Sequence, residues 1–132
     1  MTAYVWKYPS RWDDGIDYYL YAGHTSSLKG VESRISGVAF NGNKHFPKIK
    51  GRDVEVIYEE HIPQQWHGGK IGWGWCCEKT AWHEQRLINT IMNLETALYP
   101  RVIIEVLNTR GCGEKHDYIC EEARAAITTK VF

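Results

Sequence analysis

The sequence predicts an α+β domain in which a small, mostly antiparallel sheet is flanked by helices in a β-β-α-β-α layered arrangement. Three observations support this class: short segments rich in aromatic and β-branched residues, stretches with apolar residues three and four positions apart, and the alternation of the two kinds along the chain. The chain has 132 residues, 43% of them hydrophobic, which is enough for one hydrophobic core. We therefore expect a single domain over residues 1–132.

Two strands are expected first. Residues 4–7 (YVWK) and 18–22 (YYLYA) are aromatic-rich, and turn-forming residues separate them, which is typical of a hairpin. Hydroxyl residues at 25–27 then precede apolar residues at helical spacing, so a helix is expected from about Ser27 to Ala39. After a turn at 41–43, residues 45–49 are expected to be a short helical or irregular segment.

The second half of the chain predicts two more strands and two helices. Residues 53–61 (DVEVIYEEH) alternate as a strand with one buried face, and Pro63 ends it. Residues 64–75 are rich in Gly and Trp without a usable period, which indicates an ordered loop. An apolar stripe from Thr80 to Pro100 predicts the long helix. A strand at 101–107, a turn at 109–113 and a helix at 118–126 complete the order.

Charge and hydropathy restrict the function classes. Lys and Arg number 16 and Asp and Glu number 16, so the net charge is zero and gives no general attraction to phosphates or anionic membranes. The longest mostly apolar run, 99–107, is far shorter than the ~20 residues that cross a bilayer. The N-terminal residues lack a basic region followed by an apolar one. We expect a cytoplasmic protein with no membrane partner.

The cysteines fit a reducing compartment, in which buried thiols are the usual state. A structural zinc site with His83 or His116 is the alternative. Adjacent cysteines lack the two-residue separation that zinc loops normally provide. The four cysteines are Cys76, Cys77, Cys112 and Cys120.

The order of two tyrosines, an arginine and a glutamate along the chain is the most specific feature of the sequence. Tyr4 ends the tripeptide 2–4 in the first strand, and Tyr21-Ala22-Gly23 ends the second strand and is followed by His24-Thr25. Arg34 lies in the next expected helix, and Glu84 lies near the start of the long helix. This order resembles the GIY-YIG nuclease superfamily, with residues 2–4 in place of its first motif and 21–23 in place of its second.

Further positions extend the resemblance over most of the chain. His45 lies where some members carry a catalytic-site histidine, residues 54–59 are similar to the third strand, and Leu107-Asn108 is similar to the pair that closes many family domains. The first motif keeps only its tyrosine. The two motifs also lie farther apart than is usual, so the resemblance implies inserted loops at about 8–17 and 63–77.

The resemblance implies a metal-dependent endonuclease that hydrolyses phosphodiester bonds, with double-stranded DNA as the expected partner. Glu84 would bind Mg²⁺ or Mn²⁺, since carboxylate oxygens suit these ions, and Glu78 is a rival ligand. Arg34 would clamp the scissile phosphate with paired hydrogen bonds. Tyr4 is the first choice as general base, with Tyr21 orienting the water, although the sequence leaves their roles interchangeable.

Two further features bear on the expected cleavage of DNA: histidines that could transfer a proton, and a basic segment that could bind phosphates. His45 or His24 could relay the proton. The segment 43–52 holds four basic residues and no acidic one, and it offers a local patch for phosphates, with an ordinary solvated loop as the alternative. These nucleic-acid-binding candidates are Lys44, Lys48, Lys50 and Arg52.

Structural explanations remain for each candidate residue. Strand tyrosines commonly pack in cores, and a helix arginine or glutamate is commonly solvated. The alternative function is therefore a non-catalytic module that binds nucleic acid or a protein on a GIY-YIG-like scaffold, with Trp66, Trp73 and Trp75 as a stacking or docking surface. The inserted loops could also serve contacts in a homo-oligomer.

Overall fold

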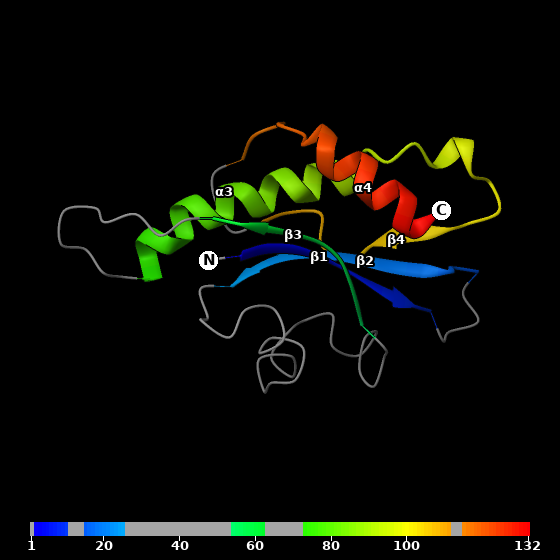
Figure 1. Ribbon diagram of the computed structural model, residues 1–132, viewed down its shortest axis with the longest axis horizontal. Coiled ribbons are helices and arrows are strands. Elements are labelled where there is room, and N and C mark those ends of the chain that lie inside the picture. The colour runs from blue at the N-terminus through cyan, green and yellow to red at the C-terminus, as the bar shows by residue number, and fades with distance from the viewer. Residues whose placement is uncertain (1, 11–14, 26–53, 63–72, 112–114) are drawn as a thin grey trace.

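The computed structural model describes residues 2–10, 15–25, 54–62, 73–111 and 115–132. These residues form a four-stranded mixed sheet in the order β3-β1-β2-β4. The two α-helices of the described residues lie on the same side of the sheet (Figure 1). The α+β class is therefore confirmed. The elements are β1 (Thr2–Pro9), β2 (Tyr18–Thr25), β3 (Glu55–His61), α3 (Trp73–Met92), the 3₁₀ helix η2 (Thr96–Leu98), β4 (Ile104–Val106) and α4 (Glu121–Val131).

Strand pairing is antiparallel in the centre and parallel at one edge. β1 pairs with β2 in register from Thr2 opposite Thr25 to Pro9 opposite Tyr18. β1 also pairs antiparallel with β3, and β4 pairs parallel with the first residues of β2. Both N-terminal strands are longer than the sequence predicts. Residues of low strand propensity at their ends belong to the strands because they form the same inter-strand pairs as their neighbours.

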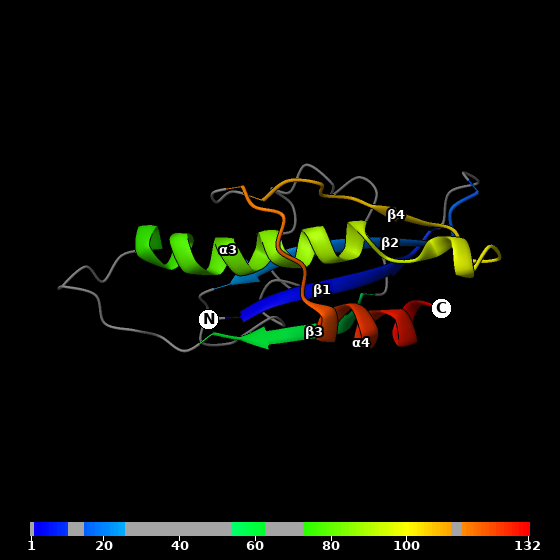
Figure 2. The same ribbon diagram turned by 90° about the horizontal axis from the view of Figure 1, so that it is seen from above.

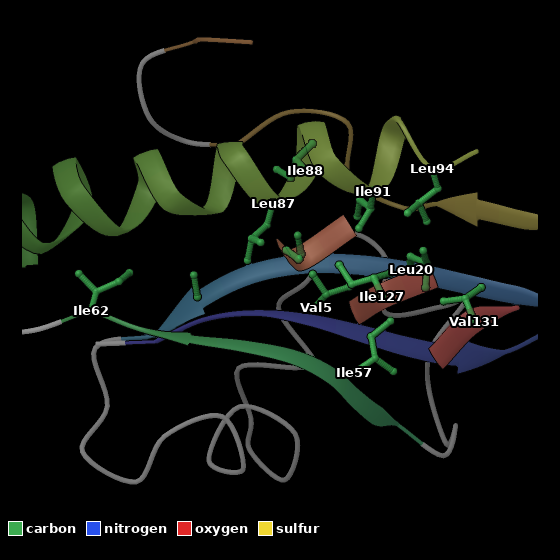
Figure 3. Close-up of a cluster of buried hydrophobic side chains, with 13 residues drawn as sticks. Val5, Leu20, Ile57, Ile62, Leu87, Ile88, Ile91, Leu94, Ile127 and Val131 are labelled. Carbon is green, nitrogen blue, oxygen red and sulfur yellow. The ribbon is translucent and has the colours of Figure 1, made fainter. Parts of the chain in front are cut away.

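The main hydrophobic core lies between the sheet and the two helices (Figure 3). α3 contacts β1 and β2, whereas α4 contacts β3, so the two helices divide the sheet between them (Figure 2). Alternation in the strands supplies one side of this core and the apolar stripe of α3 supplies the other. Its buried residues are Ala3, Val5, Leu20, Ala22, Ile57, Ile62, Leu87, Ile88, Ile91, Leu94, Ala123, Ile127 and Val131.

The opposite face of the sheet carries an aromatic cluster. Trp6 stacks on Tyr4 with ring centroids 4.5 Å apart, and Tyr8 meets the edge of Trp6 at 6.2 Å. Tyr19 is buried in the same cluster, and Tyr21 packs against it. The aromatic-rich strands thus have two buried faces, one aliphatic and one aromatic.

The predicted boundaries of the long helix were wrong at both ends. α3 begins at Trp73, so residues 73–75 belong to the helix and not to the loop predicted there. It ends at Met92, because the side chain of Asn93 donates to the carbonyl of Asn89 (2.7 Å) and its backbone N–H turns to Thr90. Leu94 stays buried although the helix has ended, so the apolar stripe extends beyond the helix.

The last two elements also differ from the prediction. The strand predicted at 101–107 is confined to Ile104–Val106, and the helix predicted at 118–126 begins at Glu121. Asn89 explains the later start, since its side chain donates to the carbonyls of residues 116 and 118 and holds this segment against α3. The helix predicted at 27–39 and the short helical or irregular segment predicted at 45–49 lie outside the described residues. No described helix is long and apolar enough to cross a membrane.

One prediction concerns the free energy of unfolding at alkaline pH. Burial, followed by the neighbouring Cys120, raises the pKa of Tyr58 to about 12. Because the folded pKa exceeds the unfolded value of about 10, the resulting stabilisation is complete below pH 10 and is lost as the pH rises toward 12. Denaturant titrations between pH 9 and 11 should show a shallower decline for Tyr58→Phe than for the wild type. The exposed control Tyr118→Phe should follow the wild type, and identical slopes for all three proteins would contradict the account.

Candidate functional site

The two tyrosine motifs meet where β1 begins and β2 ends, which we call the motif end of the sheet. Tyr4 lies opposite Gly23 in the antiparallel register. A Cβ atom on Gly23 would lie only 2.7 Å from the hydroxyl oxygen of Tyr4 and 2.9 Å or less from two ring atoms. The glycine of the second motif therefore leaves the space that the tyrosine of the first motif fills.

This packing predicts the effect of Gly23→Ala. Since the new methyl group would contact the Tyr4 ring in a fully buried place, we expect a loss of about 1–3 kcal/mol in the free energy of unfolding. Chemical denaturation measures it. In a Tyr4→Leu background, where the ring is absent, the same substitution should cost clearly less. An equal cost in both backgrounds would mean that the close approach of Tyr4 is not the cause.

Glu84 reaches the same end of the sheet from α3. Its carboxylate Oε2 contacts Nδ1 of His24, the residue that follows the second motif. Glu84 is 8% exposed as a whole residue, and the His24 side chain is 19% exposed. A buried carboxylate beside a partly exposed imidazole provides two donor atoms that suit either a proton or a metal ion.

The sheet separates these groups onto two faces. His24 lies opposite Ala3, which belongs to the core under α3, so His24 and Glu84 are on the helix-covered face. Tyr4 and Tyr21 project from the other face, where Tyr21 lies 5.7 Å from Trp6 between ring centroids. Tyr4 is 1% exposed, whereas Tyr21 is only partly buried. Of the two motif tyrosines, Tyr21 is thus the one with side-chain access to solvent.

Asn108 braces the second motif from outside the sheet. Its Oδ1 accepts a hydrogen bond from the backbone N–H of Ala22 (3.0 Å), and its Nδ2 donates to the Ala22 carbonyl. β4 pairs only with residues 18–20, so this side chain takes over the role of a neighbouring strand at residue 22. The Leu-Asn pair seen in the sequence therefore has a definite structural task beside the motif.

Several predicted site residues lie outside the described residues. They are Arg34, His45, Lys44, Lys48, Lys50 and Arg52, together with most of the inserted loop predicted at 63–77. The structure thus places Tyr4 and Tyr21 in one aromatic cluster around Trp6 and pairs Glu84 with His24. The phosphate clamp and the basic segment stay predictions.

A second polar cluster joins α3 to β3, and the sequence did not indicate it. Glu60 accepts from Arg86 and lies 2.9 Å from Nδ1 of His83. Burial lowers the pKa of His83, with Glu60 acting in the opposite direction, so the charged pair is Glu60 with Arg86. The spacing of His83 and Arg86 on one helix face was a visible signal, but their partner lies more than twenty residues away in the chain.

The described residues bear on whether this site can hold a metal ion. Among residues 2–10, 15–25, 54–62, 73–111 and 115–132, no three His, Cys, Asp or Glu side chains form a metal-binding group. The carboxylate of Glu84 and the imidazole of His24 nevertheless fit a divalent ion whose other ligands are water and substrate oxygens.

Comparison of the chain with protein-family models, curated proteins and solved structures found no match.

Proposed function

We propose that the protein is a metal-dependent DNA endonuclease of the GIY-YIG type. One observation carries the proposal: the hydroxyl of Tyr4 lies over Gly23, and the next residue, His24, contacts Glu84. Residues from both tyrosine motifs and the helix carboxylate thus lie at one end of the sheet, with the tyrosines on one face and Glu84 and His24 on the other. Packing alone gives no reason for an acidic and a basic side chain to be enclosed at this point, because such groups are costly to bury.

Within this proposal, the scissile phosphate crosses the motif end of the sheet, so that Tyr21 on one face accepts the proton of the attacking water while the ion at Glu84 lies on the other face. The partial exposure of Tyr21 allows it to contact water. Tyr4 is enclosed, and it helps to hold the Tyr21 ring in place because Trp6 packs against both tyrosines. A divalent ion bound at Glu84 would supply a Lewis acid for the developing charge on the leaving oxygen. Arg34 would hold the scissile phosphate, as the sequence order suggests.

The neutral overall charge implies that DNA is bound weakly, by a local surface, and with a modest dependence on salt. Proteins that collect phosphates with few basic residues lose less affinity per step in salt than strongly basic ones, but their affinity is lower from the start. Lys44, Lys48, Lys50 and Arg52 are the residues proposed for this contact.

The test is a cleavage assay on several forms of DNA. Supercoiled plasmid, linear duplex and single-stranded circles are incubated with the protein in Mg²⁺, in Mn²⁺ and in excess chelator. Nicking that needs the ion supports the endonuclease. Retarded migration of the DNA without cleavage in any ion would overturn it in favour of a binding module, the second function predicted from the sequence.

A further inference from the structure

We infer that the ion of the proposed site is held by His24 together with Glu84, so that the site prefers Mn²⁺, Co²⁺ or Ni²⁺ to Mg²⁺. This inference rests on the proposed function and adds a second protein ligand and a choice of metal to it. The resemblance to GIY-YIG nucleases assigns only the glutamate. His24 enters because of where the fold places its ring.

The placement of the two side chains is fixed by different elements. Register with β1 puts His24 opposite Ala3 and turns its ring toward α3, while Glu84 extends from the middle of α3 to meet it. Their side chains are 19% and 11% exposed. Leu87, one helical turn after Glu84, is fully buried in the core and holds this face of α3 against the sheet. Both donor groups are thus held on rigid elements and remain within reach of solvent.

The contacts of the histidine favour a ligand role. Nδ1 faces Oε2 of Glu84, and the described residues supply no hydrogen-bond partner for Nε2. Because Nδ1 and Oε2 face each other, an ion that replaces the proton shared between them can bind both atoms, while Nε2 points away from Glu84 and is left for water.

The donor set determines the metal preference. Mg²⁺ is a hard ion that takes oxygen ligands and keeps much of its water, whereas imidazole nitrogen suits the later first-row ions, and Mn²⁺ stands at the weak end of the same affinity series. One nitrogen and one carboxylate oxygen from the protein leave the remaining positions to water and phosphate oxygens. A site of this composition therefore discriminates among divalent ions through His24 and retains a weaker, carboxylate-based affinity for Mg²⁺.

Calorimetric titration of the protein with MnCl₂, CoCl₂ and MgCl₂, in the absence of DNA, tests the inference directly. We expect the wild type to bind Mn²⁺ and Co²⁺ at least about tenfold more tightly than Mg²⁺, and His24→Gln to lose at least about tenfold in Mn²⁺ affinity with little change for Mg²⁺. The control is His61→Gln, because His61 lies at the same end of the sheet and its Nδ1 is 3.2 Å from the Thr2 hydroxyl. His61→Gln should bind all three ions as the wild type does.

The outcomes separate this inference from the proposed function. If His24→Gln binds Mn²⁺ as tightly as the wild type, His24 is only a hydrogen-bond partner of Glu84 and the inference is wrong, even where DNA is cleaved. If Mn²⁺ affinity depends on His24 but no DNA is cleaved, the metal site stands and the endonuclease proposal fails. Equal affinity of the wild type for Mg²⁺ and Mn²⁺ overturns the metal preference.

Discussion

Replacing Glu84 by Gln is expected to lower the rate of DNA cleavage by at least about 100-fold, the usual scale for removing a group that stabilises charge in the transition state. Gln has the shape of Glu and keeps an oxygen that can accept a hydrogen bond from His24, but it lacks the negative charge that binds a divalent ion. Because the contact with His24 can persist, the melting temperature should change by about 4 °C or less. Plasmid nicking in Mn²⁺ and a thermal melt of each protein are the two measurements.

A matched control shows whether the effect belongs to this carboxylate. Glu95 lies just before η2 and is exposed, so Glu95→Gln makes the same chemical change away from the motif end of the sheet. It should cleave like the wild type. Equal cleavage by Glu84→Gln and the wild type would remove Glu84 from the reaction. A melting temperature that falls far more than expected would mark the Glu84–His24 contact as part of the fold's stability.

The second large effect is expected from Tyr21→Phe. Removing only the hydroxyl takes away the proton acceptor, and general-base catalysis contributes about 10²–10⁴ to a rate. The ring remains, so its packing beside Trp6, 5.7 Å between centroids, should persist. We expect cleavage to fall at least about 100-fold while binding of uncleaved DNA, measured by gel retardation in Ca²⁺, stays within about threefold.

Tyr19 provides the matched control for this substitution. It lies two residues earlier on β2, faces the same side of the sheet and is 1% exposed, so it has no access to water. Tyr19→Phe should cleave DNA at the wild-type rate. If Tyr19→Phe and Tyr21→Phe lose activity equally, the hydroxyls support the aromatic cluster and neither acts as the base. If only Tyr4→Phe loses activity, the proton acceptor is the enclosed tyrosine.

Local patterns in the sequence were sufficient for the element order of the described residues. Aromatic and β-branched runs identified β1, β2 and β3, and the stripe through Leu87, Ile88 and Ile91 identified α3. The ends were less predictable. Asn93 ends α3 through a hydrogen bond to its own preceding turn, and Asn89 delays α4 by holding a segment nearly thirty residues away. Such side-chain contacts depend on tertiary structure, so periodicity does not reveal them.

The candidate residues could be chosen from the sequence, but their arrangement in the fold could not. Tyr4, Tyr21 and Glu84 stand out by residue type and order, and the glycine at position 23 follows from the second motif. The pairing of His24 with Glu84 spans sixty residues and depends on how α3 crosses the sheet. The tyrosines and the carboxylate lie on different faces because of the strand register. A shift of one residue would move every side chain to the other face, and a single sequence does not determine the register to that precision.

The chemistry of the DNA ends produced by the wild-type protein in Mn²⁺ tests the central claim most directly. Hydrolysis with the 3′-oxygen as leaving group must leave a 3′-hydroxyl and a 5′-phosphate, so nicked plasmid should be resealed by DNA ligase without further treatment. The account predicts ion-dependent nicks that the ligase closes, and their loss in Glu84→Gln. Intact plasmid in every divalent ion, or nicks that end in a 3′-phosphate, would contradict it.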